Sequence, residues 1–209
     1  MPPIRALIYD LEIKRAIPDK RGASIPGIEY CAGWHDHAAM GISTLCAYDC
    51  FEERYRVFCD DNKEEFFQLA KDRLLVGYNS ISFDNAVLRA CWDFVTPERE
   101  DFCYDILQQI WIAAGLAPEF RYPTHIGFGL DDVYRATFNE SGKTGHGALA
   151  PVMWQRGEIG AVIDYCLQDV KLTLRLFKLI LEGGALVNPK VMGGLLRLRM
   201  PQMPGEQHG

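Results

Sequence analysis

The stretch Ala6–Ile13, ALIYDLEI, is an apolar run that contains two acids, Asp10 and Glu12. On a β-strand, residues two apart project from the same face, so both carboxylates would lie together. The opposite face would carry only apolar side chains, namely those of Leu7, Tyr9, Leu11 and Ile13. Two like charges in a partly buried site repel and lose hydration, unless one is protonated or a cation lies between them. Acids that turn into solvent at the end of a strand are the simpler alternative.

A third acid, Asp84, occurs in VGYNSISFDNAVL. This segment predicts a junction between a strand that ends near Tyr78 and a helix that begins near Ser82. A junction of this kind can present a carboxylate at the end of a sheet. The alternative is local: Ser82 would be the N-cap, and Asp84 would interact with the positive end of the helix dipole.

A fourth acid, Asp169, follows Tyr165 by four residues in YCLQD, within a helix predicted over residues 158–182. The polar face of that helix is defined by residues at three- and four-residue steps: Asp164, Gln168, Lys171, Arg175, Lys178 and Glu182. Asp169 lies roughly 140° from the centre of this stripe, at about 100° per residue. We therefore expect it to face protein, with Tyr165 one turn away. A tyrosine packed beside a hydrogen-bonded acid is the alternative.

Taken in order, YDLE, NSISFD and YCLQD resemble the three motifs of the DnaQ-like, or DEDD, 3′-to-5′ exonucleases. The tyrosine in the third motif corresponds to the subclass found in DNA polymerase proofreading domains. The segment GKTGHGALAPVMWQRGEIGAVIDYCLQDVKLTLRLF is similar to stand-alone exonucleases related to the family B polymerase proofreading domain. The resemblance extends over about residues 7–177. It implies an α/β, ribonuclease H-like fold with a mixed central sheet flanked by helices.

The resemblance also implies a catalytic set: Asp10, Glu12, Asp84, Tyr165 and Asp169. The four carboxylates would hold two divalent metal ions, Mg²⁺ or Mn²⁺, because these ions prefer hard oxygen ligands. Two ions about 3.5–4 Å apart stabilise both the attacking and the leaving oxygen in phosphodiester cleavage. Tyr165 would orient the attacking water, since an unperturbed phenol ionises only near pH 10.

We expect substrate contacts at four further positions: Leu11, Asn79, Phe83 and Lys143. Phe83, Tyr78 and Trp34 are aromatic residues that could stack on a base, which is a sequence-tolerant contact. Aromatic residues are more often part of the core, so packing is the alternative for each of them.

The elements that must position these residues follow from periodicity and turn signals. We predict strands over residues 5–13, 28–36, 43–50, 55–60 and 73–79. We predict helices over residues 61–72, 82–94, 105–115, 130–139 and 158–182. Strands followed by alternating elements are typical of a mixed sheet flanked by helices. We expect one exonuclease domain over residues 1–199 and a disordered tail over residues 200–209.

The composition of the chain indicates its cellular compartment and excludes some classes of partner. The chain has 209 residues and a net charge of -6, which argues against a broad basic surface for long duplex nucleic acid. No apolar run approaches the roughly 20 residues that span a bilayer, and the N-terminus lacks a secretory pattern. The seven cysteines are odd in number and irregularly spaced, which favours a reducing compartment. We expect a cytoplasmic protein without membrane association.

Three other signals are weak. Gly142-Lys143-Thr144 is not a phosphate-binding loop, because position 137 is Thr instead of Gly. The segment WHDH with Cys46 and Cys50 lacks the paired spacing of a zinc site. The remaining acids of interest, Asp105, Asp131 and Asp132, are expected to cap helices or to form an outer shell of the metal site, with caps the default.

The expected reaction is hydrolysis of the terminal phosphodiester at a free 3′ end, which releases nucleoside 5′-monophosphates. Single-stranded DNA is the expected substrate, although the motifs do not distinguish DNA from RNA. A catalytically inactive nucleic-acid-binding module and an endonuclease on the same fold are the alternatives. A separate polymerase or repair protein is an open partner, and the oligomeric state does not follow from the motifs.

Overall fold

The computed structural model describes residues 4–19, 24–96, 102–140, 142 and 147–204. Its centre is a five-stranded sheet in the order β3-β2-β1-β4-β5. The strands are β1 (Ala6–Ile13), β2 (Ile42–Asp49), β3 (Arg54–Phe58), β4 (Leu74–Gly77) and β5 (Cys103–Asp105). β1 pairs antiparallel with β2 and parallel with β4, so the sheet is mixed. The predicted α/β fold class is therefore confirmed.

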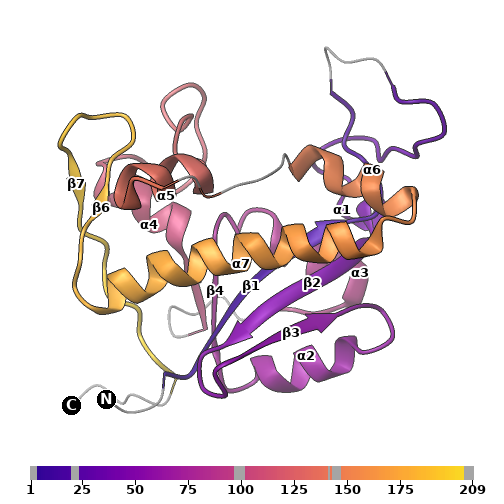
Figure 1. Cartoon of the computed structure of the whole chain (residues 1–209), viewed down its shortest axis with the longest axis horizontal. Coiled ribbons are helices and arrows are strands. Elements are labelled where there is room, and N and C mark those ends of the chain that lie inside the picture. Colours follow the sequence, from indigo (N-terminus) through magenta and orange to yellow (C-terminus); the bar gives the residue numbers. More distant parts are fainter. Residues whose placement is uncertain (1–3, 20–23, 97–101, 141, 143–146, 205–209) are drawn as a thin grey trace.

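Helices cover both faces of this sheet (Figure 1). The long helix α7 (Ile159–Leu181) lies across β1 and β2, whereas α2 (Lys63–Ala70) and α3 (Asp84–Trp92) lie on the other face. The remaining elements are α1 (His37–Met40), α4 (Ile106–Ala113), α5 (Leu130–Phe138), η1 (Gly147–Leu149), α6 (Ala150–Gln155), β6 (Leu186–Val187) and β7 (Leu195–Leu196). Within the described residues, no helix is both long and apolar enough to cross a membrane.

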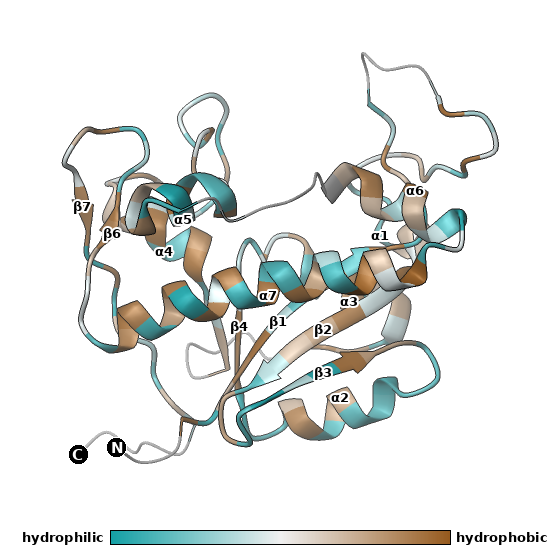
Figure 2. Ribbon diagram, viewed as in Figure 1, coloured by the Kyte–Doolittle hydropathy of each residue, from teal (hydrophilic) through white to brown (hydrophobic). Residues whose placement is uncertain are grey.

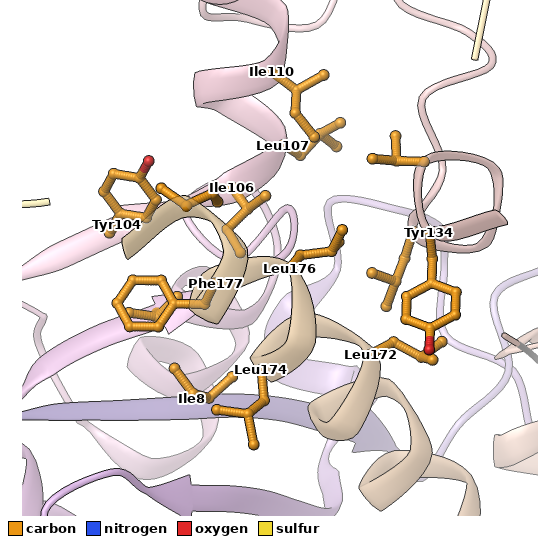
Figure 3. Packing of buried hydrophobic residues seen from close by; sticks show 14 of the residues in the cluster. Ile8, Tyr104, Ile106, Leu107, Ile110, Tyr134, Leu172, Leu174, Leu176 and Phe177 are labelled. Atoms are coloured by element: carbon orange, nitrogen blue, oxygen red, sulfur yellow. The ribbon is translucent and has the colours of Figure 1, made fainter. Parts of the chain in front are cut away.

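β1 separates two hydrophobic clusters. Ala6 and Ile8 pack with α7, whereas the alternate residues Leu7, Tyr9, Leu11 and Ile13 pack with α2 and α3. Figure 3 shows Ile8 of β1 close to Leu174 and Phe177 of α7. The strand's alternation therefore decides that Asp10 and Glu12 project from the face that α7 covers. The prediction that both acids share one face is confirmed.

α7 is amphipathic, and Figure 2 shows hydrophilic and hydrophobic residues alternating along it. Its polar stripe is exposed except at the half-buried Gln168, whereas Asp169 is only 6% exposed and lies on the buried side. The prediction that Asp169 faces protein is confirmed. Its position follows from 3.6-residue periodicity alone, because Leu172, Leu176 and Ile180 on the same arc are also buried.

The predicted elements agree with the structure at most positions, with ends that differ by a few residues. The strand predicted over residues 28–36 is wrong: Tyr30 makes one isolated bridge to Ala16, and the chain then turns. Asp36 closes that turn by accepting a hydrogen bond from the Ala32 N–H at 2.8 Å. The three-residue strand β5 and the short helix α6 were not predicted, because neither is long enough for a clear periodicity.

The domain boundaries stay a prediction. Residues 205–209 of the expected tail lie outside the described residues, whereas residues 200–204 are described. Just before them, the Tyr104 hydroxyl donates to the backbone carbonyl of Arg199 at 2.6 Å. The chain leading into the tail is thus held against the sheet edge.

Removal of the Phe177 side chain tests the packing between α7 and β1. Phe177 is fully buried, and Phe177→Ala should lower the free energy of unfolding by about 3–5 kcal/mol. The exposed Asp164 on the same helix is the matched control, and Asp164→Ala should change it by less than about 1 kcal/mol. Urea denaturation followed by circular dichroism measures both, and equal effects would contradict this packing.

Candidate active site

Asp10 and Glu12 lie in the second half of the central strand. β4 pairs only with Ala6–Ile8, so β1 extends past the end of β4. Glu12 is buried, and Asp10 is partly exposed. The backbone carbonyl and the carboxylate of Asp10 both accept from the Cys166 thiol of α7, at 3.3 and 3.6 Å. These contacts place the two acids of the first motif directly beneath α7.

Asp84 stands at the start of α3 and contacts β1 beyond the end of β4. Its Oδ1 accepts a hydrogen bond from the backbone N–H of Leu11 at 3.2 Å. Leu11 stands between Asp10 and Glu12, so this one contact brings the second motif beside the first. The hydrogen-bonding edge of β1 is open here because β4 has ended.

The alternative for this segment, in which Ser82 is the N-cap of the helix, is wrong. α3 begins at Asp84 itself, with Phe83 at the N-cap position and no side-chain cap. The predicted N-cap, Ser82, is exposed and precedes the helix. Asp84 does lie in the first turn, where the helix dipole favours its charge, but its carboxylate binds β1.

The turn that carries the second motif is held by Asp105. One oxygen of its carboxylate accepts from the Asn79 N–H at 2.9 Å, and the other accepts from the Ile81 N–H at 3.0 Å. It also caps α4 by accepting from the Leu107 and Gln108 N–H groups. The prediction that Asp105 caps a helix is confirmed. Asp105 also anchors the NSISFD turn, which the sequence did not predict. Only the pairing of β5 with β4, which aligns Gly77 with Asp105, reveals that role.

Tight geometry explains why this turn carries small and flexible residues. Asn79 has a φ of 67°, in the left-handed region that asparagine tolerates better than most residues. A Cβ at Gly77 would lie 2.5 Å from the Cβ of Ser80. The chain can therefore double back from β4 toward α3 only with glycine at position 77.

The electrostatics link the acids of the separate motifs. The pKa of Asp84 is raised from 3.8 to about 8, first by burial and then by the negative charges of Asp105 and Asp169. The pKa of the Cys166 thiol is also raised, mainly by burial, with Asp10 and Glu12 among the further causes. Asp84 and Asp169 thus influence each other, and α7 lies within the field of the first motif. The four motif acids occupy one neighbourhood.

The acids do not form a ready ligand set. In the described parts of the chain, no group of three or more His, Cys, Asp or Glu residues is arranged to hold a metal ion. The chemistry of the donors nevertheless fits hard divalent cations, because all four are carboxylates. Burial and then the neighbouring carboxylates of Asp105 and Asp169 raise the pKa of Asp84, and a bound cation would favour its ionised form.

The predicted substrate-binding residues have different surroundings. Phe83 is half-buried, and its ring lies 6.0 Å from that of Trp34. Leu11 is 4% exposed and packs in the core, so its structural role is clear, whereas its contact with substrate stays a prediction. Substrate contact by Asn79 likewise stays a prediction, and Lys143 lies outside the described residues.

Tyr78 and Tyr165 complete the predicted set. The Tyr78 hydroxyl donates to the Phe128 carbonyl, and its ring packs against the core beneath α7, which indicates a structural role. Tyr165 is half-buried and precedes Asp169 by one turn of α7. Its position on α7 is therefore as predicted, whereas its role in catalysis stays a prediction.

Comparison with known proteins supports the fold. No family model and no curated protein sequence matches the chain. Among solved structures, the chain is similar to the family B DNA polymerase from the hyperthermophilic archaeon Pyrobaculum calidifontis, with a TM-score of 0.55 and 20% identity. The match covers 86% of this chain and 25% of the polymerase chain. At this identity the likeness concerns the fold, which is consistent with a ribonuclease H-like arrangement.

The pKa of Asp84 predicts a pH-dependent stability in metal-free protein. Because the pKa is higher in the folded state, the folded protein keeps a proton that the unfolded chain has released. Stability should therefore fall as the pH rises from about 4 to about 8. Asp84→Asn keeps an oxygen for the Leu11 N–H and removes the charge, so its decline should be smaller.

Urea denaturation in EDTA at about pH 5 and about pH 8 measures this difference. Asp164→Asn is the matched control, since Asp164 is an exposed acid of α7. An equal decline in wild type and Asp84→Asn would show that Asp84 is not the group responsible.

Proposed function

We propose that this protein is a metal-dependent 3′-to-5′ exonuclease that shortens single-stranded DNA and releases nucleoside 5′-monophosphates. The observation that carries the proposal is the hydrogen bond between the Asp84 carboxylate and the Leu11 N–H. It joins two motifs that are 73 residues apart and places Asp84 beside Asp10 and Glu12. The negative charge of Asp169 raises the pKa of Asp84, which supports including the third motif in the same site.

In this proposal Asp10, Glu12, Asp84 and Asp169 hold two Mg²⁺ or Mn²⁺ ions. When bound, the ions would lower the pKa of a coordinated water and stabilise negative charge on the phosphate oxygens. Asp84 binds β1 and Asp105 holds the turn before α3, so that the Asp84 carboxylate is already in place before substrate arrives. Such preorganisation reduces the reorganisation needed during the reaction.

The chemical step is the displacement of a 3′ oxygen by water. The water oxygen forms a bond to phosphorus, the bond from phosphorus to the 3′ oxygen breaks, and the shortened strand leaves with a 3′ hydroxyl after gaining a proton. Tyr165 orients the water through its hydroxyl, and Phe83 contacts the terminal nucleotide. The partly exposed Asp10 and half-buried Tyr165 would lie nearest to substrate.

The two alternative functions are an inactive nucleic-acid-binding module and an endonuclease. An inactive nucleic-acid-binding module would need no carboxylate cluster, yet all four motif acids are present in this chain. An endonuclease would cut circular DNA, which has no 3′ end. The likeness to a DNA polymerase fold agrees with all three functions, so the reaction itself must decide between them.

A 5′-labelled single strand provides that test. With Mg²⁺ we expect a ladder that shortens from the 3′ end, and no ladder in EDTA. Asp10→Ala and Asp169→Ala should each lower the rate by at least about a hundredfold, on the scale of lost electrostatic stabilisation of a transition state. The exposed Asp164→Ala is the matched control and should keep the wild-type rate.

Cleavage of a circular single strand would indicate an endonuclease instead. An unchanged ladder in EDTA would overturn the two-metal scheme. Binding without cleavage under every metal condition would favour the inactive module. Calorimetric titration with Mn²⁺ adds a measurement that does not depend on turnover, because Asp10→Ala should weaken metal binding.

The role of Tyr165 is tested by Tyr165→Phe, which removes only the hydroxyl. We expect kcat to fall by about tenfold to a hundredfold with KM nearly unchanged, because an orienting hydrogen bond acts on the chemical step. The loss should be smaller than for Asp10→Ala. If Tyr165→Phe keeps full activity, the hydroxyl does not position the water.

A further inference from the structure

Trp34 is an exposed aromatic side chain beside the second motif. It is 66% exposed, although tryptophan is usually among the most buried residues on average. Its ring centroid lies 6.0 Å from that of Phe83 at an interplanar angle of 65°. Phe83 directly precedes Asp84, so Trp34 lies close to the acid cluster. His37 is a further aromatic neighbour of Phe83, at 6.3 Å between ring centroids.

The segment that carries Trp34 is held from both sides. At its start, the Gln155 side chain of α6 accepts from the Glu29 N–H at 2.7 Å and donates to the Lys14 carbonyl at 2.9 Å. At its end, the Cys91 thiol of α3 donates to the His37 carbonyl at 3.3 Å. α1 and α6 lie at the same end of the molecule (Figure 1). Trp34 is thus presented by a braced segment.

A braced and exposed tryptophan is suited to binding. The tryptophan side chain has few rotatable bonds, so little conformational entropy is lost when it binds. Its apolar face is also costly to leave in water. The contact with Phe83 is edge-to-face, which leaves Trp34 mostly in solvent. A flat, aromatic ligand that arrives beside Asp84 could stack on it.

The net charge of the protein points to the same kind of contact. At -6, the chain as a whole repels the phosphate backbone of nucleic acid. Affinity for single-stranded DNA then needs a source other than a broad basic surface. Stacking of bases on aromatic rings is such a source, and it does not require neutralised phosphates.

We propose that Trp34 is a stacking platform for an unpaired base near the 3′ end of single-stranded DNA. The inference rests on the proposed exonuclease function, and it assigns substrate binding to a residue outside the three motifs. A base paired within a duplex cannot separate from its neighbours to stack on Trp34 without a cost. The platform therefore favours single strands over duplex ends.

Trp34→Ala should weaken binding of a 5′-labelled single strand by about tenfold, whereas Trp34→Phe should retain most of the affinity. Fluorescence anisotropy in EDTA measures binding while the proposed hydrolysis is prevented. Tyr122→Ala is the matched control, because Tyr122 is 79% exposed and belongs to the segment between α4 and α5. Figure 1 shows α4 and α5 at the opposite end of the molecule from α1. The affinity of Tyr122→Ala should equal that of wild type.

Three further measurements separate stacking from a structural effect. Unlabelled DNA should quench tryptophan fluorescence in wild type and much less in Trp34→Phe. The ratio of the wild-type and Trp34→Ala affinities should stay constant as salt increases, because stacking neutralises no phosphate. Removal of one base among the last few of the oligonucleotide should abolish the difference between wild type and Trp34→Ala.

In turnover, Trp34→Ala should raise KM and leave kcat at saturating substrate nearly unchanged. Equal affinity of wild type and Trp34→Ala for the single strand would overturn the inference. So would an equal loss of affinity for blunt duplex, or the absence of any base whose removal abolishes the difference.

The two proposals can fail separately. If Asp10→Ala abolishes the ladder while Trp34→Ala binds normally, only the platform is wrong. If Trp34→Ala binds weakly but the wild-type protein does not hydrolyse DNA, only the proposal of exonuclease activity is wrong.

Discussion

The unequal length of two neighbouring strands is the constraint on which the site depends. β1 continues to Ile13, whereas β4 ends at Gly77 and pairs with β1 only as far as Ile8. The backbone of β1 beyond that point needs another partner on this side, since buried N–H groups are almost always hydrogen-bonded. The Asp84 carboxylate binds the Leu11 N–H there. The first and second motifs therefore meet where β1 no longer pairs with β4.

This arrangement is electrostatically costly. Asp84 is buried near other carboxylates, and its pKa is raised to about 8 for that reason. Asp105 is buried as well, with a raised pKa caused first by burial, although several backbone N–H groups offset the effect. Buried carboxylates with raised pKa values are concentrated at functional sites in proteins. The cost is concentrated where the three motifs converge, whereas the two hydrophobic clusters on either side of β1 supply the stability.

The structure also distinguishes the groups that position the site from those that could react. Asp105 anchors the turn before α3, and Cys166 contacts Asp10 from α7. Gln155 and Cys91 brace the segment that carries Trp34. Of these residues only Cys166 lies within a motif, the third, where it is not one of the acids.

What could be read from the sequence was set by local geometry. The period of two on β1 places Asp10 and Glu12 on one face, and the period of 3.6 on α7 places Asp169 on the buried side. Both results need only the chain within a few residues of each acid. The motif spacing added the expectation of a common site.

Other features depended on contacts between distant parts of the chain. Asp105 could be predicted as a cap, but its hold on Asn79 requires the parallel pairing of β4 and β5. Ser82 satisfied the local rules for an N-cap, yet α3 begins at Asp84, whose carboxylate binds β1. The contact of Trp34 with Phe83 joins a turn to a helix start 49 residues away. Local periodicity determined which way the acids point, whereas strand order and packing decided what they meet, because those interactions form only between segments that folding brings together.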